Sequence, residues 1–253
     1  MSPILTIQRA MSPILTITKR ELGGFFNSPV AYVFLVIFLL MTGAFTFFIG
    51  QFFDRGQANL QPFFMWHPWL YLFLVPAVGM RLWSEERRLG TLELLLTMPI
   101  SPWQSITGKF IASWGFLILA LSLTFPIWWT VNDLGSPDNG AIFTGYIGSA
   151  LMAGGYLAIT SMTSALTRNQ VISFILSVVI CLSLVLCGWP PVTDPLAAYF
   201  PNWIVEGVAA FSVMPHFDRL QQGVIDSRDL IYFISLIGFP LFATSVIIRS
   251  LRS

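Results

Sequence analysis

Charge is scarce in this sequence: only 10% of its 253 residues are Asp, Glu, Lys or Arg. Soluble domains carry about 25% charged residues, so this scarcity excludes an ordinary soluble domain. The two cysteines, Cys181 and Cys187, are six residues apart on one predicted helix, where a disulfide between them is sterically excluded. His67 and His216 have no Cys or second His at ligand spacing, so we expect no metal site. The net charge of +1 is uninformative about nucleic acid, but no basic stripe is present to follow a phosphate backbone, so we expect no nucleic-acid partner.

Long apolar runs are what the chain has in place of charge, with 55% hydrophobic residues and a mean hydropathy of +0.75. Six runs carry no charged residue; they cover residues 30–53, 56–80, 110–132, 139–167, 169–193 and 230–248. Each is at least 19 residues long, and about 20 apolar residues cross a hydrocarbon core of about 30 Å. Open strands would leave backbone groups unpaired in lipid, and the short alternating segments of a barrel are absent. The sequence therefore predicts an all-α integral membrane protein with six transmembrane helices.

The basic residues predict how these six helices are oriented. Ten of the 13 fall on one side: Arg9, Lys19, Arg20, Arg81, Arg87, Arg88, Lys109, Arg168, Arg249 and Arg252. Arg55, Arg219 and Arg228 fall on the other. Because cytoplasmic loops carry the excess of Lys and Arg, we expect both termini in the cytoplasm and the chain in a bacterial inner membrane. Tryptophans such as Trp83 and Trp189 lie near the ends of the runs, where amphipathic rings favour the headgroup level.

The N-terminal region, residues 1–29, is predicted to precede the spans. Met1–Ile7 and Met11–Ile17 are the same heptapeptide, MSPILTI, which we interpret as a duplicated start. Residues 12–27 alternate apolar and charged positions in a way that favours an amphipathic helix lying in the inner membrane interface. The rest of the chain, residues 30–253, is then one six-helix transmembrane domain.

Two segments of that domain have distinctive patterns. The fourth run carries Gly145, Ser149 and Ala153 on one helical face, and small residues let helices approach closely in lipid; we favour packing within the chain over a subunit interface. Residues 190–228, on the outer side, contain five prolines and an apolar stretch too short to cross, which indicates an interfacial or re-entrant element. Polar residues near the outer side could line an exit, although we favour loop solvation for them: Asn132, Asp133, Glu206 and Asp218.

The densest charge lies in RLWSEERRLGTLELLLTMP, residues 81–99, between the second and third runs. Ser84 is the expected N-cap, and two glutamates in the following turn complement the helix dipole. Leu89, Leu92 and Leu96 form an apolar stripe at helical spacing. The pattern predicts a short surface helix over about residues 84–98, ended by Pro99.

This predicted helix has two interpretations. One is a juxtamembrane segment that only anchors a loop. Its three acidic residues and the mid-helix Gly90 favour the other interpretation, because a lipid-binding helix is usually basic and a glycine there costs about 1 kcal/mol relative to alanine. A charged face with a glycine that permits close approach is suited to docking into a groove of another protein.

The same stretch resembles a known family signature. Residues 85–101, EERRLGTLELLLTMPIS, followed by Gly108-Lys109, are similar to the pattern E-E-x-x-x-G-T-x-E-x-L-x-T-x-P-[IL]-[ST]…G-K. This pattern is typical of ABC-2 type permease subunits, which have the type V exporter-like fold. Residues 65–80 and 215–229 are most similar to the gliding-motility-associated permeases.

The resemblance implies a homodimer, or a dimer with a related permease, that carries two cytoplasmic ABC ATPase subunits. The helix over 84–98 would be the coupling helix, and its contact set would be Glu85, Glu86, Arg87, Gly90, Thr91, Leu92 and Glu93. ATP and Mg would be bound by the ATPase, because the loop Gly135–Gly140 is followed by Ala-Ile where a phosphate loop requires Lys-Ser/Thr. We therefore expect no catalytic site and no cofactor of its own. Membrane lipids and an accessory envelope protein complete the expected partners.

The expected function is that of a permease subunit that couples ATP hydrolysis to substrate movement, with export as the expected direction. One alternative is a non-transporting membrane subunit that transmits force in an ATPase-driven envelope or motility machine. A second alternative, an ion-coupled carrier, normally needs ionisable residues deep in the membrane, and the six charge-free runs argue against it. The sequence leaves the substrate open.

Overall fold

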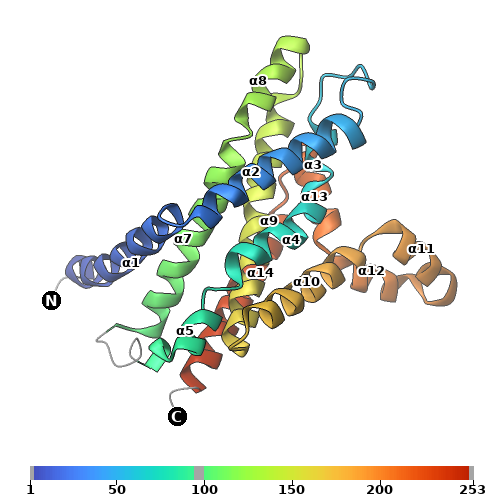
Figure 1. The fold of residues 1–253 in the computed structure, drawn as a ribbon. Helices are drawn as coiled ribbons and strands as arrows, with labels where there is room; N and C mark the ends of the chain where they lie inside the picture. The colour runs from blue at the N-terminus through green and yellow to red at the C-terminus, as the bar shows by residue number, and fades with distance from the viewer. Residues whose placement is uncertain (1–2, 94–99, 251–253) are drawn as a thin grey trace.

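The computed structural model describes residues 3–93 and 100–250, and in these ranges the chain is helical without any strand (Figure 1). The first helices are α1 (Pro3–Phe26), α2 (Pro29–Ala44), the π-helical turn η1 (Phe45–Ile49), α3 (Gln61–Phe64), α4 (His67–Gly79) and α5 (Ser84–Leu89). Next come α7 (Pro102–Ser122), α8 (Phe125–Leu134), α9 (Asn139–Leu166) and α10 (Gln170–Leu186). The last are α11 (Pro190–Tyr199), α12 (Asn202–Ala210), α13 (Val213–Gln221) and α14 (Ser227–Ser250).

Several helices begin where a polar capping residue precedes an apolar run. The Ser28 hydroxyl accepts the Val30 N–H at 3.3 Å at the start of α2. The Asp138 and Asn169 side chains cap α9 and α10 in the same way. Such caps satisfy N–H groups that have no partner within the helix. Helices α9 and α10 therefore begin close to where the fourth and fifth charge-free runs begin.

Within the described residues, four helical segments are long and apolar enough to cross a membrane: Pro29–Ile49, Pro102–Leu134, Asn139–Leu166 and Ser227–Ser250. Helices α10 and α11 add a fifth if they count as one span, broken by a bend of 62°. Helix α4 has 13 residues and rises about 20 Å, less than the thickness of a hydrocarbon core. The predicted all-helical membrane class is confirmed, with four or five candidate spans, and six crossings stay a prediction.

Helix α9 is the centre of the bundle. It contacts α4, α7, α10, α13 and α14, and most of its side chains are buried. A Cβ at Gly145 would lie 2.6 Å from the Phe64 ring, and a Cβ at Gly155 would lie 2.6 Å from Leu236. The missing side chains let α3 and α14 approach the α9 backbone. The predicted packing of small residues within the chain is confirmed.

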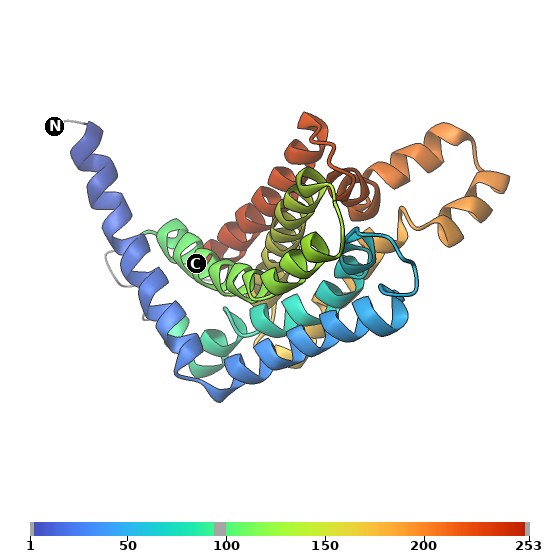
Figure 2. The ribbon, with the colours of Figure 1, turned by 90° about the horizontal axis from the view of Figure 1, so that it is seen from above.

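Helix α1 leaves the bundle on one side, and the α11–α12 pair projects on another (Figure 2). Where α1 crosses α7, a Cβ at Gly108 would lie 2.8 Å from Ile17 Cγ2. The Thr18 hydroxyl donates to the Gly108 carbonyl at 3.2 Å, and the Phe25 and Phe116 rings stack at 5.0 Å. The N-terminal segment is therefore helical over Pro3–Phe26, a longer range than the predicted 12–27, and it packs on α7 through a close backbone crossing. Its position in the membrane interface stays a prediction.

The predicted interfacial segment 190–228 folds into three short helices, α11, α12 and α13. Of these three helices, α13 is the one that packs extensively on α9 and α14 within the described residues. The fully buried Asp229 carboxylate at the start of α14 holds it there, lying 2.6 Å from His216 Nδ1 and 2.9 Å from Arg219 Nε. A buried carboxylate is retained when it is paired and hydrogen-bonded, so this network joins α13 to α14.

Candidate functional site

The predicted coupling segment lies at one end of the molecule, which we call the α5 end. Helix α5, the start of α7 and the C-terminal ends of α9 and α14 gather there (Figure 1). The opposite end carries α3, α8 and α13 (Figure 1). The distribution of Lys and Arg already predicted this shared end, because Arg81, Lys109, Arg168 and Arg249 all fall on one side, but it did not indicate which side chains contact one another here.

The N-terminus of α5 is capped by α9 rather than by its own first residues. Ser164 Oγ accepts the N–H groups of Trp83 and Ser84, both at 3.0 Å, and donates to the Met80 carbonyl at 2.9 Å. The prediction of Ser84 as N-cap is wrong, because Trp83 occupies the N-cap position without a side-chain cap and Ser84 is already helical. A serine 80 residues along the chain does what a local N-cap normally does.

Trp83 is also buried, with 1% exposure, so its ring packs against its own chain. Its indole N–H donates to Ser161 Oγ at 3.0 Å. A buried indole usually finds such a partner. Two hydroxyls on the last turns of α9, those of Ser161 and Ser164, therefore fix the position at which α5 begins.

A buried lysine joins α5 to α7 and α1. Lys109 Nζ lies 2.8 Å from Glu86 Oε1 and 3.7 Å from Glu21 Oε1. It also donates to the Leu82 carbonyl at 3.1 Å and lies 5.1 Å from the centre of the Trp83 ring. The lysine side chain is 5% exposed and the Glu86 side chain 20%. Because a lysine loses hydration on burial, these two carboxylates and the ring replace water around it.

Arg87 makes a further contact with α9 by donating from Nη1 to the Ala165 carbonyl. Burial, and secondarily the like charge of Arg168, lower the pKa of the Arg87 guanidinium from its usual value. Arginine stays protonated at neutral pH in spite of such a shift. The positive charge of Arg87 is also favourable here, because the Ala165 carbonyl lies at the negative, C-terminal end of the α9 dipole.

Gly90 ends α5. Its φ of 71° is left-handed, and its N–H bonds to the Glu86 carbonyl, as in a common glycine C-cap. The prediction of one continuous helix over 84–98 is therefore wrong: α5 stops at Leu89, and residues 91–93 are helical again beyond the glycine. Residues 94–98 lie outside the described residues. The glycine is required by backbone conformation, which is a different reason from the close approach suggested by the sequence.

The predicted contact set splits into an inner and an outer group. Glu86 and Arg87 face their own chain, and Leu92 is buried, with 5% exposure. The side chain of Glu85 is 41% exposed and that of Arg88 60%, and they form only a weak surface pair at 3.7 Å. The residues of the outer group are exposed, except that Glu85 is partly buried: Glu85, Arg88, Leu89, Gly90, Thr91 and Glu93. We call this group the outward face of α5.

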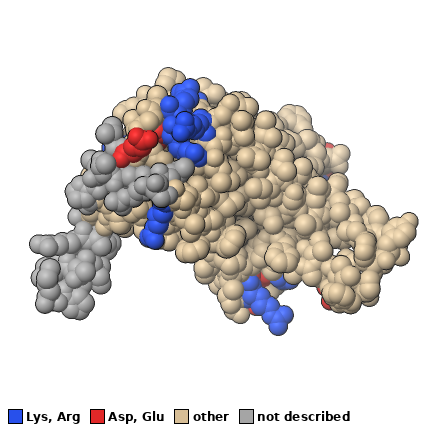
Figure 3. All heavy atoms as spheres, turned by 90° about the horizontal axis from the view of Figure 1, so that it is seen from below, with Lys and Arg blue, Asp and Glu red and all other residues tan. Residues whose placement is uncertain are grey.

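Charge is concentrated at this end. Figure 3 views it and shows basic side chains gathered in a patch, with an acidic group beside it, on a surface that is otherwise largely uncharged. Arg88 and Arg168, at the ends of α5 and α9, are both exposed. Among the described residues, no group of three or more His, Cys, Asp or Glu is placed to hold a metal ion. The α5 end therefore presents an exposed, charged surface.

Comparison with known protein families identifies the family to which the chain belongs. The family described as ABC-2 family transporter protein matches residues 15–202, which is well over half of the chain. The chain belongs to the ABC-2 transporter family. Members of this family are the transmembrane permease components of ABC transporters and work with ABC ATPase partners. The family is broader than the gliding-motility-associated permeases, and no curated protein matches the chain.

The matched range, residues 15–202, includes every residue of the α5 end on α1, α5, α7 and α9 discussed above, and it therefore includes Lys109 and its contacts. An ABC-2 permease with these helices is a multi-pass membrane protein. The sequence pattern did not assign a structural role to Lys109, Ser161 or Ser164. The sequence interpretation includes Lys109 only as part of the Gly108-Lys109 pair of the signature and as one of the charges on the inner side.

Proposed function

We propose that this ABC-2 protein is a permease subunit that couples ATP hydrolysis by two separate ATPase subunits to export of a substrate across a bacterial inner membrane. It would work as a dimer with a second copy or with a related permease. One observation carries the proposal: α5 has an exposed outward face and an inward face engaged with α7 through Lys109 and with α9 through Ser164. That division is what a coupling element needs, because one face must bind a partner while the other moves the membrane domain.

The inward contacts supply a route for the coupling. Glu86 is joined to α7 through Lys109, and Ser164 holds the backbone at the start of α5. A partner that displaces α5 would therefore move the start of α7 and the end of α9 together. Coupling requires that the ATPase bind the two positions of α5 with different affinities. The buried ion pair and the cap make α5 a rigid link for such a displacement.

We also propose six crossings: α2 with η1, α3 with α4, α7 with α8, and then α9, α10 and α14. An even number of crossings places both termini on the same side as α5, which agrees with their shared end in Figure 1. The basic residues at this end, such as Arg88 and Arg168, favour the cytoplasm. The ATPase would then find the outward face of α5 on the side where ATP is present.

Co-purification of the ATPase with the tagged permease tests this proposal. Leu89→Asp and Glu93→Lys change two residues of the outward face that make no hydrogen bond or ion pair with any described residue. We expect the double variant to lose most of the bound ATPase while its melting temperature stays within about 2 °C, because surface changes cost little stability. Asp194→Lys makes the same charge change as Glu93→Lys on the exposed surface of α11 and should retain the ATPase.

Retention of the ATPase by the Leu89→Asp/Glu93→Lys variant would contradict the proposal. Transport by the intact complex in proteoliposomes, with ATP supplied outside, then tests the export step. If ATP hydrolysis depended on the permease but no substrate of any tested class moved, the force-transmitting alternative would replace transport. A cysteine at position 93 that reacted with an impermeant reagent on intact cells would overturn the proposed orientation.

A further inference from the structure

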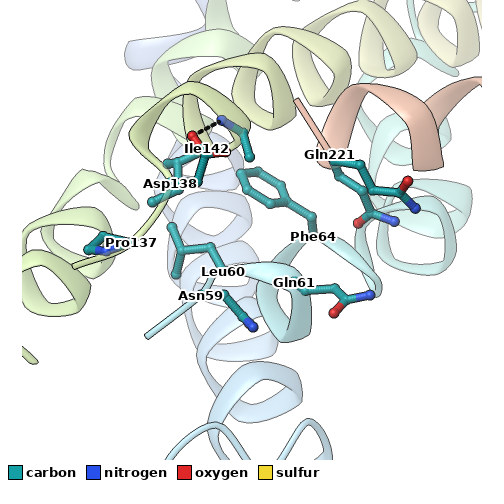
Figure 4. Close-up of a pocket in the computed structure, with 10 residues that line it drawn as sticks. Asn59, Leu60, Gln61, Phe64, Pro137, Asp138, Ile142 and Gln221 are labelled. Atoms are coloured by element: carbon teal, nitrogen blue, oxygen red, sulfur yellow. Dashed lines mark hydrogen bonds between the residues drawn. The ribbon is translucent and has the colours of Figure 1, made fainter. Parts of the chain in front are cut away.

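The opposite end of the molecule contains two adjoining cavities that the coupling site does not use. The first, of about 290 Å³, lies between α3, the start of α9 and the end of α13 (Figure 4). The second, of about 590 Å³, lies between the start of α4, the α10–α11 corner and α13. The two share Gln61, Gln221 and Gln222. Ligand cavities commonly have volumes of about 300–1,000 Å³, and the second cavity falls in this range.

A close backbone contact shapes the second cavity. A Cβ at Gly188, in the corner between α10 and α11, would lie 2.5 Å from the side chain of Ser212. The glycine therefore lets the corner approach the start of α13. This places Trp189, the next residue, opposite α4 and beside α13.

Aromatic side chains dominate the wall of this cavity. Trp66 and Trp69 come from the start of α4, and Trp189 comes from the α10–α11 corner, 120 residues further along the chain. The Trp69 and Trp189 rings meet edge to face at 5.3 Å. Met65 and Met214 add polarizable side chains beside them. Three indoles from two distant segments thus converge on one space.

One carboxylate shares this space. Asp218, on α13, is the only charged residue among the described residues that line the cavity. Its Oδ1 accepts from Gln221 Nε2 at 2.6 Å, and it forms no ion pair with any described residue. The neighbouring Arg219 is bound to Asp229. The cavity therefore holds a half-buried negative charge without a protein cation to balance it.

We propose that this cavity binds an organic ammonium group, with the cation held between the indole rings of Trp66, Trp69 and Trp189 and the carboxylate of Asp218. Tryptophan faces attract cations within about 6 Å, and aromatic cages bind quaternary ammonium groups in this way. A Ca²⁺ or Mg²⁺ ion needs several oxygen ligands in place of indoles. An anion would meet the Asp218 charge, and a neutral sugar would leave that charge unbalanced. The source is either a lipid headgroup or a free amine, and both present the same chemistry.

Calorimetric titration of the full chain in dodecyl maltoside tests the site without any ATPase. The probes are choline and its neutral isostere 3,3-dimethyl-1-butanol, which differ only in the charge of the central atom. We expect choline to bind at least about tenfold more tightly. Asp218→Asn should weaken choline binding by about tenfold while leaving the isostere unchanged, because the amide keeps the shape and loses the charge.

Matched variants separate the cavity from general effects. Asp194→Asn removes the same charge from an exposed position on α11 and should leave choline binding unchanged. Trp189→Leu should weaken it about tenfold, whereas Trp129→Leu changes an indole that is 67% exposed on α8 and should not. Equal binding of choline and the isostere, no binding of either, or Asp218→Asn binding like wild type would each overturn the proposal.

Nanodiscs distinguish the two sources of the ammonium group. In phosphatidylcholine discs, a headgroup site would be occupied by lipid, so added choline should bind at least about tenfold more weakly than in phosphatidylglycerol discs. A site for free amines would give the same choline affinity in both. Either result supports an ammonium site and assigns its source, and the variants above must behave the same way in the phosphatidylglycerol discs.

Discussion

Lys109 Nζ lies 2.8 Å from Glu86 Oε1, at the buried junction of α5 with α7. The two residues belong to the two parts of the family-like signature, the paired glutamates and the later Gly-Lys. The sequence interpretation assigned Glu86 to the ATPase, but its carboxylate faces its own chain. The signature therefore has two functions: part of it builds the junction and part of it forms the outward face of α5.

Lys109→Met should destabilise the protein by about 3 kcal/mol, because it leaves the Glu86 and Glu21 carboxylates without the cation between them. Glu86→Gln should cost less, since Glu21 still faces the lysine. The Lys109→Met/Glu86→Gln double variant should recover part of the loss. Thermal unfolding in detergent measures all three. Lys19→Met, on the exposed surface of α1, is the control. If Lys109→Met and Lys19→Met had equally small effects on the melting temperature, the role given to the Lys109–Glu86 pair would be refuted.

Gly90→Ala should cost about 1 kcal/mol, because alanine in a left-handed conformation is strained. The cost is not a clash, since nothing lies within 4 Å of a Cβ at this position. Gly90→Asn should cost less, because asparagine tolerates this conformation. Gly115→Ala is the matched control: its Cβ also meets nothing, but its backbone is helical, so we expect a neutral or stabilising effect.

The same Gly90 variants test the two reasons for the glycine. If backbone conformation is the reason, the Gly90→Asn protein should keep both its stability and its bound ATPase. If a stable Gly90→Asn protein lost the ATPase, the close approach of a partner backbone would be the reason instead. Co-purification, with the melting temperature measured on the same sample, separates these outcomes.

Gly108→Ala should displace α1 from α7, because the added Cβ would lie 2.8 Å from Ile17 Cγ2 and 3.2 Å from the Ile14 carbonyl. We expect a loss of about 1–3 kcal/mol, typical of overpacking. Ile17→Ala in the same chain should restore part of the stability by removing the side chain that clashes. If Gly108→Ala melted like Gly115→Ala, the close crossing of α1 and α7 would not exist in solution.

Much of the architecture could be predicted from local pattern. The charge-free runs correspond to helices because backbone groups in lipid must bond within their own segment. The small residues of α9, such as Gly145, indicated a helix that others approach closely, and the close packing of Phe64 against Gly145 confirms it. Such inferences need only periodicity, composition and the physics of the bilayer.

The contacts that define the α5 end could not be predicted in this way. Ser84 and Ser164 have the same side chain, and only the tertiary structure brings Ser164 to the N–H groups of Trp83 and Ser84. Lys109 precedes an apolar run, so its pattern suggested an exposed charge, yet Glu86 and Trp83 enclose it. On a surface helix, a face that contacts its own chain and a face that contacts a partner have the same helical periodicity. The sequence pattern therefore could not tell which residues of α5 face inward.

Asp218→Asn should raise the melting temperature near neutral pH, even though it removes the proposed ammonium site. Burial raises the pKa of the Asp218 carboxyl above its ordinary value of 3.8, and the hydrogen bond from Gln221 offsets this only in part. Because the folded-state pKa is the higher one, ionisation costs stability, and this cost appears as the pH rises through the raised pKa. The asparagine keeps the acceptor for Gln221 Nε2 and loses the charge.

We expect a gain of less than about 1 kcal/mol, since the carboxylate is only partly withdrawn from water. Unfolding followed from about pH 7 to about pH 4 should show the advantage of Asp218→Asn shrinking as the wild-type carboxyl takes up its proton. Asp194→Asn, exposed on α11, should show no such trend. A lower melting temperature for Asp218→Asn at neutral pH would mean that the charge is stabilised by its surroundings, and the cavity would then have no unbalanced carboxylate to offer a cation.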